Sequence, residues 1–479
     1  MNLGRLPFIR NVSSLFSGGD HHAANAQLSG TDPCAGYRFQ KITSPTNSPD
    51  LLLMLAFSGG GTRAAALSYG VLEELARTPV DSGEGRHRML DEVDIISSVS
   101  GGSFTAAYYA LWGDRIFSDF ESQFLKNDVQ SDLLRSALSP RNQFRLASPR
   151  FSRSDLAAEH YDRLLFEGAT FADLIKQRDR PFVSINATDI ASGARFEFTQ
   201  DEFDLIGSDL SQFPISRAVA ASAALPICLT PVILTNHSVA EPRPEPEWIK
   251  SILANPMASA RLKFVATHAR SYFNGQRHFI HLVDGGLSDN LGLRGALDRA
   301  IAREQFAQMP SVPWTLPRRI AIIVVNAHRD LDFGWDTHEL PLGLGSLLGS
   351  LGQISVSHYS FETVELFREV MARLARENTD SGDSAPPEFS TYVIHLHFKE
   401  LASDADRQFF NSVPTSLQLP ATTVDRLRHL AARELAGNAE FRRLVRDLGA
   451  LPGKSNSPAR SVAAAQKAAP TANPFTPHL

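Results

Sequence analysis

The sequence predicts an α/β fold, in which helices cover both faces of a parallel or mixed sheet. Two continuous apolar runs, Leu51–Phe57 and Val93–Val99, are typical of strands that are buried on both sides. A turn rich in Gly or Ser leads from each run into a stretch with helical spacing, at Thr62–Arg77 and Gly102–Trp112. Strands that alternate with helices in this way build a sheet between two layers of helices.

The same alternation continues along the chain. Further strands are expected at Phe182–Ala187, Arg195–Thr199, Leu262–Thr267, Phe279–Val283, Ile320–Val325 and Tyr392–His397. Further helices are expected at Ile215–Ala224, Leu291–Gln305, Phe361–Arg376 and Thr423–Leu435. Because no linker or repeat interrupts this pattern, residues 49–450 are expected to form one domain that ends in a helical extension. The polar leader 1–48 and the Ala-, Pro- and Ser-rich tail 451–479 are expected to be loosely ordered.

Composition narrows the classes of protein that the chain can belong to. With 479 residues, 43% of them hydrophobic, the chain can bury a large core. Its formal charge of −5 offers no basic footprint for nucleic acid. The cysteines, Cys34 and Cys228, are too few for a disulfide framework, and they are not clustered with histidines as a zinc site requires. Two isolated thiols also fit a reducing compartment.

Neither a signal-peptide core nor an apolar run of about 18 residues is visible in the sequence. A cytoplasmic or peripherally membrane-associated protein is therefore favoured, and any contact with a membrane is expected to be peripheral. The oligomeric state stays open.

A glycine loop, Ser58–Arg63, follows the first predicted strand. Its three glycines leave backbone N–H groups unobstructed at a helix start, where they can bind a phosphate or a developing oxyanion. A Walker A loop would need Gly-Lys-Ser/Thr where this chain has Thr62-Arg63-Ala64, and the glycines lack the spacing of a dinucleotide fingerprint. A flexible turn without chemistry is the alternative.

The second predicted strand ends at Ser100, within Ser97–Ser103. A nucleophile elbow is a tight strand–turn–helix that needs small residues two positions before and two positions after its serine. Ser98 and Gly102 occupy these positions, although glycine is usual at the first of them. The alternative is that Ser100 or Ser103 only caps a helix.

A serine nucleophile needs a base, and Asp284 is the candidate at a strand end, directly before Gly285 and Gly286. His281 lies three residues earlier in the same strand and so points to the opposite face. An aspartate has an ordinary pKa of about 3.9, and burial would raise that pKa and make the carboxylate a better base. The alternative is a simple Asp-Gly turn.

The three elements Gly-Gly-Gly-x-Arg, x-x-Ser-x-Gly and Asp-Gly-Gly, in this order, resemble the patatin-like phospholipase family, particularly its bacterial members. The segment Ile215–Pro226 is also similar to a helix of that family, and the resemblance covers about residues 50–435. It implies a three-layer α/β/α sandwich around a mostly parallel central sheet. It also implies hydrolysis of acyl esters of phospholipids or related lipids, without a metal or cofactor.

The resemblance also assigns roles to residues. Ser100 would be the nucleophile and Asp284 its base, in a dyad without histidine. The oxyanion hole would use backbone N–H groups of Gly59, Gly60, Gly61 and Gly101. Arg63 would contact an anionic head group, although a surface or structural ion pair is the plainer expectation. The chain departs from the family pattern at Ser98 and at Ala64, where the family commonly has glycine.

Two other functions stay open on the sequence. One is a lipid-binding pseudoenzyme that keeps the fold without turnover. The other is an esterase or thioesterase that acts on acyl groups outside phospholipids, because the dyad chemistry would be the same.

Overall fold

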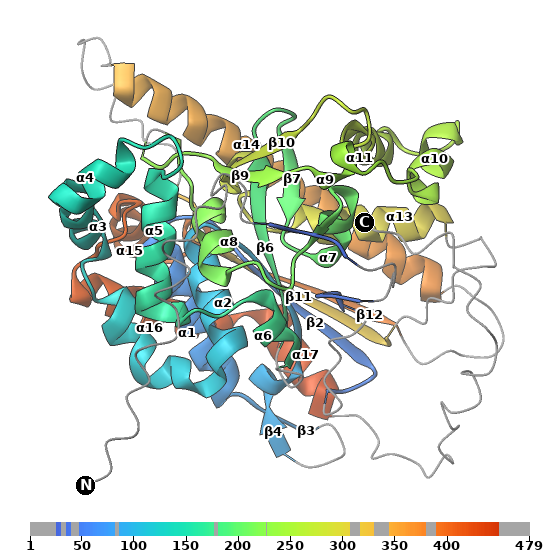
Figure 1. Ribbon diagram of the computed structural model, residues 1–479. Coiled ribbons are helices and arrows are strands. Elements are labelled where there is room, and N and C mark those ends of the chain that lie inside the picture. Colours follow the sequence, from blue (N-terminus) through green and yellow to red (C-terminus); the bar gives the residue numbers. More distant parts are fainter. Residues whose placement is uncertain are drawn as a thin grey trace, which may run out of the picture.

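A mixed eight-stranded sheet forms the centre of the protein, with helices on both of its faces (Figure 1). The computed structural model describes residues 25–29, 35–39, 47–81, 86–176, 181–226, 228–306, 317–329, 344–379 and 389–449. Helices α1, α2 and α16 lie on one side of the sheet in Figure 1, and α13 and α14 lie on the other. The predicted α/β fold with a mostly parallel sheet is confirmed.

The strands of the central sheet follow one another in the order β12 (Ser390–His397), β11 (Arg319–Asn326), β2 (Leu51–Phe57), β5 (Val93–Val99), β6 (Phe182–Asp189), β10 (Phe279–Asp284) and β9 (Val232–Thr235), with β7 (Ala194–Glu197) also paired to β6. The first five are mutually parallel, whereas β7 and β10 run antiparallel to β6. Two short pairs lie outside it: β1 (Ala26–Gln27) with β8 (Ser208–Asp209), and β3 (Pro79–Asp81) with β4 (Arg86–Arg88).

Most helices lie between these strands in the chain. They are α1 (Thr62–Arg77), α2 (Gly101–Trp112), α3 (Val129–Leu138), α4 (Pro140–Leu146), α5 (Arg153–Tyr161), α6 (Phe171–Lys176), α7 (Gln200–Leu205), α8 (Ile215–Ser222), α9 (His237–Ala240), α10 (Glu247–Ala254), α11 (Ala260–Ser271), α12 (Gly286–Asp289), α13 (Arg294–Phe306), α14 (Leu344–Thr379), α15 (Asp404–Ser412), α16 (Ala421–Gly437) and α17 (Ala439–Gly449). Ala64 lies in the first turn of α1, where alanine is a good helix former.

The strand register brings the ends of three strands to one level. The last residues of β2 and β5 lie side by side, because these strands are parallel and Phe57 pairs with Ser98. Val99 pairs with Asn186 of β6, and the next residue of β6, Ala187, pairs with Asp284 at the end of β10. Ser100 and Asp284 therefore stand level with each other, although β10 runs in the opposite direction.

One predicted strand is wrong. Residues Leu262–Thr267 lie inside helix α11. The apolar residues and the β-branched Val265 and Thr267 favour a strand locally. In the fold, however, Leu262, Ala266 and Ala269 recur at helical spacing and are buried, and Ser259 caps the helix through its side chain. Tertiary packing of this face outweighs the local preference.

Parts of the expected leader belong to the folded body. Residues 26 and 27 form β1, which pairs with β8. The hydroxyl of Tyr37 accepts a hydrogen bond of 2.8 Å from the Val183 N–H of the central sheet, and buried Arg38 pairs with Asp204 at 2.5 Å. The expectation of loose order is therefore wrong for these stretches. The tail at 451–479 lies outside the described residues, and so do the remaining parts of the leader.

Within the part of the chain that the structure describes, no helix combines the length and the apolar character that crossing a bilayer requires.

Candidate active site

A sharp turn holds Ser100 between β5 and α2. Its backbone has φ 49° and ψ −117°, a conformation that a residue with a side chain rarely adopts. Such strain is typical of a nucleophile elbow, which projects its serine from a strand–helix turn. Gly102 makes the turn possible, because a Cβ there would lie 2.7 Å from the carbonyl oxygen of Phe57.

Ser98 fits the position where an elbow usually has glycine. Its side chain is buried, and its hydroxyl donates a hydrogen bond of 3.3 Å to the carbonyl oxygen of Ser184 on the neighbouring strand. The hydroxyl is therefore satisfied without disturbing the turn.

The Ser100 hydroxyl donates a hydrogen bond of 2.8 Å to Oδ2 of Asp284. The other oxygen, Oδ1, accepts a hydrogen bond of 2.8 Å from the N–H of Gly286, which fixes the orientation of the carboxylate. Asp284 is 8% exposed. Burial raises its pKa to about 6, although the hydrogen bonds from Gly286 and Ser100 partly oppose this shift. Such a pKa suits a general base near neutral pH.

The glycine loop lies directly against the elbow. A Cβ on Gly101 would lie 2.1 Å from the carbonyl oxygen of Gly61, so the two backbones touch. Gly60 and Gly61 have φ of 142° and 62°, which favour glycine. This contact brings the start of α1 and the start of α2 together beside Ser100.

The sequence predicts that the N–H of Gly59 helps to bind the oxyanion, but in the structure this N–H has another partner. It donates a hydrogen bond of 3.0 Å to the carbonyl oxygen of Asn290, so it is not free to bind an oxyanion. Among the described residues, no partner is found for the N–H groups of Gly60 and Gly61. A Cβ on Gly59 would also lie 2.7 Å from Oδ1 of Asn290, which packs between the glycine loop and the Asp284 turn.

Arg63 is buried, which contradicts a role in binding a head group. Its guanidinium donates hydrogen bonds to the carbonyl oxygens of Ala327 at 2.8 Å and Val413 at 2.6 Å, and to the Thr415 hydroxyl at 3.0 Å. These partners are neutral oxygens, so the contacts of Arg63 differ from the ion pair that the sequence led us to expect. Burial, with the charge of Arg329, lowers the pKa of Arg63 to about 9.

Three further polar side chains hold the backbone around Ser100 and Asp284. Ser222 accepts a hydrogen bond of 2.8 Å from the Ser100 N–H and donates one of 2.6 Å to the Asn186 carbonyl. The amide of Asn186 donates to the Ser98 carbonyl at 3.0 Å, and the Thr188 hydroxyl donates to the Asp284 carbonyl at 2.8 Å. The only signal in the sequence is that polar residues interrupt β6 and end α8, and it does not reveal these partners.

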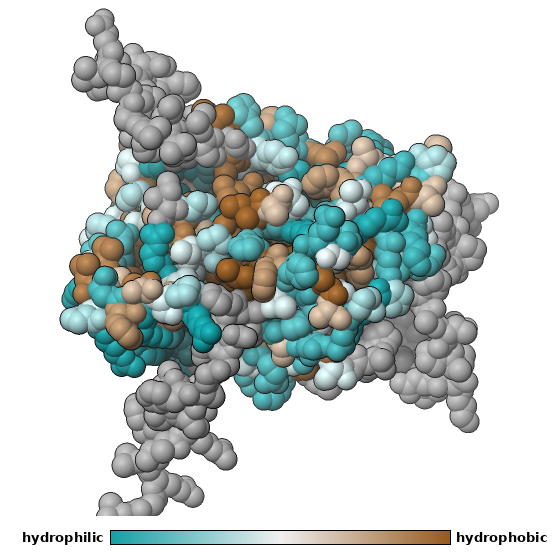
Figure 2. Space-filling model, turned by 45° about the horizontal axis from the view of Figure 1, so that its top comes forward, coloured by the Kyte–Doolittle hydropathy of each residue, from teal (hydrophilic) through white to brown (hydrophobic). Residues whose placement is uncertain are grey.

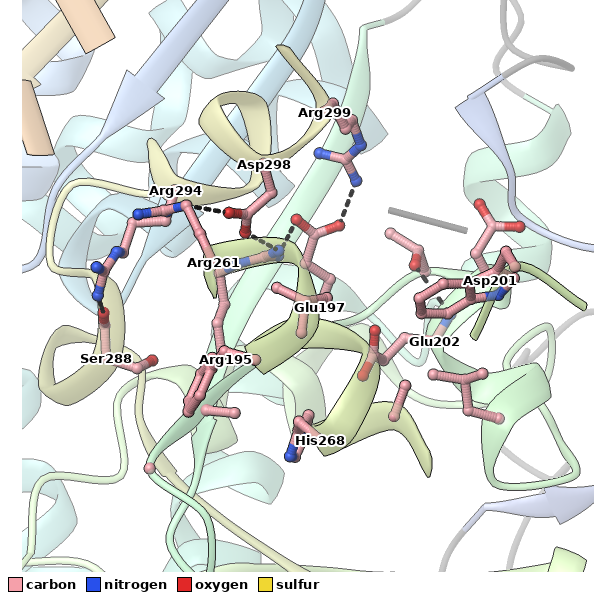
Figure 3. Close-up of a pocket in the computed structure, with 18 of the residues that line it drawn as sticks. Arg195, Glu197, Asp201, Glu202, Arg261, His268, Ser288, Arg294, Asp298 and Arg299 are labelled. Carbon is pink, nitrogen blue, oxygen red and sulfur yellow. Dashed lines mark hydrogen bonds and ion pairs between the residues drawn. The ribbon is translucent and has the colours of Figure 1, made fainter. Parts of the chain in front are cut away.

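A separate cavity of about 320 Å³ lies behind the Asp284 turn, lined by residues of β7, α7, α11 and α13. Figure 3 shows its charged side chains pointing toward one another. Glu197 pairs with Arg195 and, at 2.6 Å, with Arg299. Asp298 pairs with Arg261 at 2.5 Å and with Arg195 at 3.4 Å. These charges are matched to one another, which indicates a supporting role for this network.

The cavity adjoins the turn that carries Asp284. Ser288 lines it, and the Ser288 hydroxyl lies 2.8 Å from that of Thr188, which in turn donates to the Asp284 carbonyl. Arg294 donates a hydrogen bond of 3.1 Å to the Ser288 carbonyl. Arg294 and Ser288 therefore link the lining of the cavity to the turn that carries Asp284.

We expect Glu197→Gln to lower the free energy of unfolding by about 3–5 kcal/mol, because it leaves the largely buried Arg195 without its carboxylate partner and also breaks the pair with the more exposed Arg299. Urea unfolding followed by circular dichroism measures this. The matched control is Glu247→Gln at an exposed pair with Lys250, where a change below about 1 kcal/mol is expected. Equal effects of the two substitutions would contradict a supporting role for the network.

Metal ligation finds no support in the described residues, which contain no group of three or more His, Cys, Asp or Glu side chains placed to hold an ion. His395 and His397 share one face of β12, where their rings stack with centroids 5.5 Å apart. His395 contacts Glu400 at 3.2 Å and Asn326 at 3.3 Å.

Comparison with known proteins decides the family. Residues 55–297 match the family described as patatin-like phospholipase, and this segment carries the glycine loop, the elbow and Asp284. The chain belongs to the patatin-like phospholipase family. No curated protein matches the chain.

Two solved structures similar to this patatin-like chain are human GIVD cytosolic phospholipase A2 and VipD from Legionella pneumophila. The human protein is 13% identical with a TM-score of 0.43, and the match covers 84% of this chain and 60% of the human one. VipD is 12% identical with a TM-score of 0.26, and the match covers 82% of this chain and 70% of VipD. The chain thus spans less than two thirds of the length of the human protein.

Proposed function

We propose that this patatin-like protein hydrolyses acyl esters of phospholipids or related lipids, with Ser100 as nucleophile and Asp284 as general base. The observation that carries the proposal is the hydrogen bond of 2.8 Å between the Ser100 hydroxyl and Oδ2 of the buried Asp284. A serine at a strained elbow, bonded to a carboxylate of raised pKa, is arranged for nucleophilic attack. Membership of the family supports a lipid substrate.

The first half of the reaction acylates Ser100. Its oxygen attacks the ester carbonyl carbon while its proton moves to Oδ2 of Asp284, and the carbonyl oxygen becomes an oxyanion. The N–H groups of Gly60, Gly61 and Gly101 are the donors proposed for this oxyanion, and the engaged N–H of Gly59 is left out. The intermediate collapses to the acyl-enzyme, and Asp284 returns the proton to the departing alcohol oxygen.

The second half releases the fatty acid. Water attacks the carbonyl carbon of the acyl-enzyme and gives its proton to Asp284. When the second tetrahedral intermediate collapses, the bond to Ser100 breaks and Asp284 returns the proton to the serine oxygen. Each half uses the same base and the same oxyanion donors, and no redox partner is needed.

The test measures fatty-acid release from phospholipid vesicles and from a soluble short-chain ester, with a chelator present. The enzyme is then treated with a fluorophosphonate, whose phosphorus is attacked by a serine oxygen with loss of fluoride. We expect hydrolysis in the chelator and a covalent adduct on the peptide that contains Ser100. An adduct on another residue would disprove the proposed nucleophile, and vesicle binding without hydrolysis would favour a pseudoenzyme.

We expect the rate on the soluble ester to rise with pH around a midpoint near 6, because Asp284 must be ionised to accept the proton and its pKa is raised to about 6. The stability contribution has the opposite sign. The folded protein holds this proton more tightly than the unfolded chain, so stability falls as the pH rises from about 4 to about 6. A pH–rate profile and urea unfolding across this range measure both. A flat profile would contradict the role of Asp284.

A further inference from the structure

Helices α3 and α4 form a hairpin that contributes little to the core. Among its residues only Val129 is buried in α3, and none is buried in α4. Leu134, Leu138 and Phe144 are instead 58%, 73% and 85% exposed. Leu134 and Leu138 lie four positions apart and therefore share one face of α3. Figure 2 shows apolar side chains gathered at the left of the view, on the side where Figure 1 places α3 and α4.

The hairpin is also basic. The hairpin, residues 129–146, contains three arginines and one aspartate, a net charge of +2, in a chain whose net charge is −5. The arginines are Arg135, Arg141 and Arg145, and the last of these pairs with Glu159. Arg141 is exposed, and the side chain of Arg135 is largely exposed beside Asp132. Exposed leucine and phenylalanine next to arginine are the composition of helices that lie in the interface of an anionic membrane.

One side of the hairpin adjoins the glycine loop through the segment 416–418. The Leu417 N–H donates a hydrogen bond of 3.3 Å to the Gln130 side chain, and the Gln418 side chain donates one of 2.8 Å to Asp128 at the cap of α3. The Ser416 carbonyl in turn accepts a hydrogen bond of 2.9 Å from the Thr62 N–H, which directly follows the glycine loop.

Helix α5, which follows the hairpin in the chain, adjoins the segment that leads to Asp284. Ser154, at the start of α5, donates its hydroxyl proton to the Thr230 carbonyl. Thr230 belongs to the segment that follows Ala224, whose carbonyl accepts a hydrogen bond of 3.0 Å from the Asp284 N–H. Leu225 and Leu287, close in sequence to these two residues, are exposed as well. The hairpin and the following helix α5 together thus connect to both loops that flank Ser100.

We propose that the α3–α4 hairpin is the surface by which the protein binds an anionic lipid membrane. Leu134, Leu138 and Phe144 enter the boundary between head groups and acyl chains, while the neighbouring arginines contact lipid phosphates. Because the hairpin and α5 connect to the loops around Ser100, this docking presents the dyad to the lipid layer. The inference rests on the proposed lipid substrate and adds the membrane-facing element and the lipid charge that it selects.

The experiment measures co-sedimentation with vesicles of phosphatidylcholine alone and of phosphatidylcholine mixed with phosphatidylglycerol. All variants carry Ser100→Ala so that no lipid is consumed. Phe144→Glu is compared with Met257→Glu, since both residues are 85% exposed and Met257 lies between α10 and α11, away from the hairpin in Figure 1. A third variant, Arg135→Gln/Arg141→Gln, removes charge only.

We expect Phe144→Glu to weaken binding to the mixed vesicles at least about tenfold, because a charged side chain replaces the aromatic ring that enters the membrane. Met257→Glu is expected to bind like the parent. The arginine variant is expected to lose most of its preference for the anionic vesicles. The three surface substitutions are also made in the protein that keeps Ser100. There, all three are expected to leave the rate of hydrolysis of the soluble ester unchanged, because none of the substituted residues touches Ser100 or Asp284.

Parent-like binding by Phe144→Glu, or equal loss with Met257→Glu, would overturn the inference. The inference would also be overturned if the hairpin variants bound vesicles like the parent while light scattering showed that the hairpin mediates self-association. That result would make the surface an interface between protein copies. Failure of the proposed function would give a different result. In that case the wild type releases no fatty acid from either substrate, while the effect of Phe144→Glu on vesicle binding is still seen.

Discussion

Ser100→Ala is expected to lower the rate of ester hydrolysis at least about 10⁴-fold, because it removes the nucleophile and leaves only the binding and oxyanion contributions. Asp284→Asn is expected to lower the rate by about 10²- to 10⁴-fold, the range of a general base. The amide keeps the shape of the carboxylate but cannot take up the serine proton. Steady-state rates on the soluble ester measure both effects without a membrane.

The double variant gives the sharper result. Because Ser100 and Asp284 act on the same proton, Ser100→Ala/Asp284→Asn is expected to be no slower than Ser100→Ala alone. Asp284→Asn is also expected to be at least as stable as wild type at pH 7, since it removes a buried charge. Multiplicative losses in the double variant would mean that the two residues act independently, contrary to a dyad.

Gly101→Ala is the second substitution with a large expected effect. Its new Cβ would lie 2.1 Å from the Gly61 carbonyl oxygen and 2.6 Å from the Gly61 nitrogen. Since both obstacles are backbone atoms, no side-chain rotation relieves the clash, and the elbow and the glycine loop must separate. We expect a loss of about 10²- to 10³-fold in kcat as the oxyanion donors move out of place. The free energy of unfolding is expected to fall by about 1–3 kcal/mol.

Gly437→Ala provides the control, because a Cβ there meets no atom within 4 Å. This variant is expected to keep both the rate and the stability of wild type. A fully active Gly101→Ala protein would contradict the proposed oxyanion hole. Loss of stability with an unchanged kcat would mean that the contact between the two loops serves folding alone.

The sequence predicts the parts of the site that depend on local backbone geometry. The elbow, the glycine loop and the Asp284 turn each need small residues at fixed offsets, and these can be recognised along the chain. The strands β2 and β5 are likewise visible with their observed bounds, since a strand buried on both faces is a continuous apolar run.

Other features depend on partners that are distant in the chain and leave no local pattern. Strand β9 is four residues long, Val232–Thr235, and no predicted strand corresponds to it. The engaged N–H of Gly59 depends on Asn290, the elbow support depends on Ser222, and the burial of Arg63 depends on a segment more than 300 residues away. Helix α11 is predicted as a strand because its apolar and β-branched residues favour a strand locally, whereas its conformation is decided by how Leu262, Ala266 and Ala269 pack against the rest of the protein.

The partners of Arg63 and Thr62 have a consequence for the order in which the protein is made. The family match ends at residue 297, yet the glycine loop is held by Val413, Thr415 and Ser416. On the ribosome, residues 55–297 emerge long before these partners are translated. The loop beside Ser100 gains its outer support only after residue 416 has been made, so a chain that stops before this point carries every residue of the motif without the complete site.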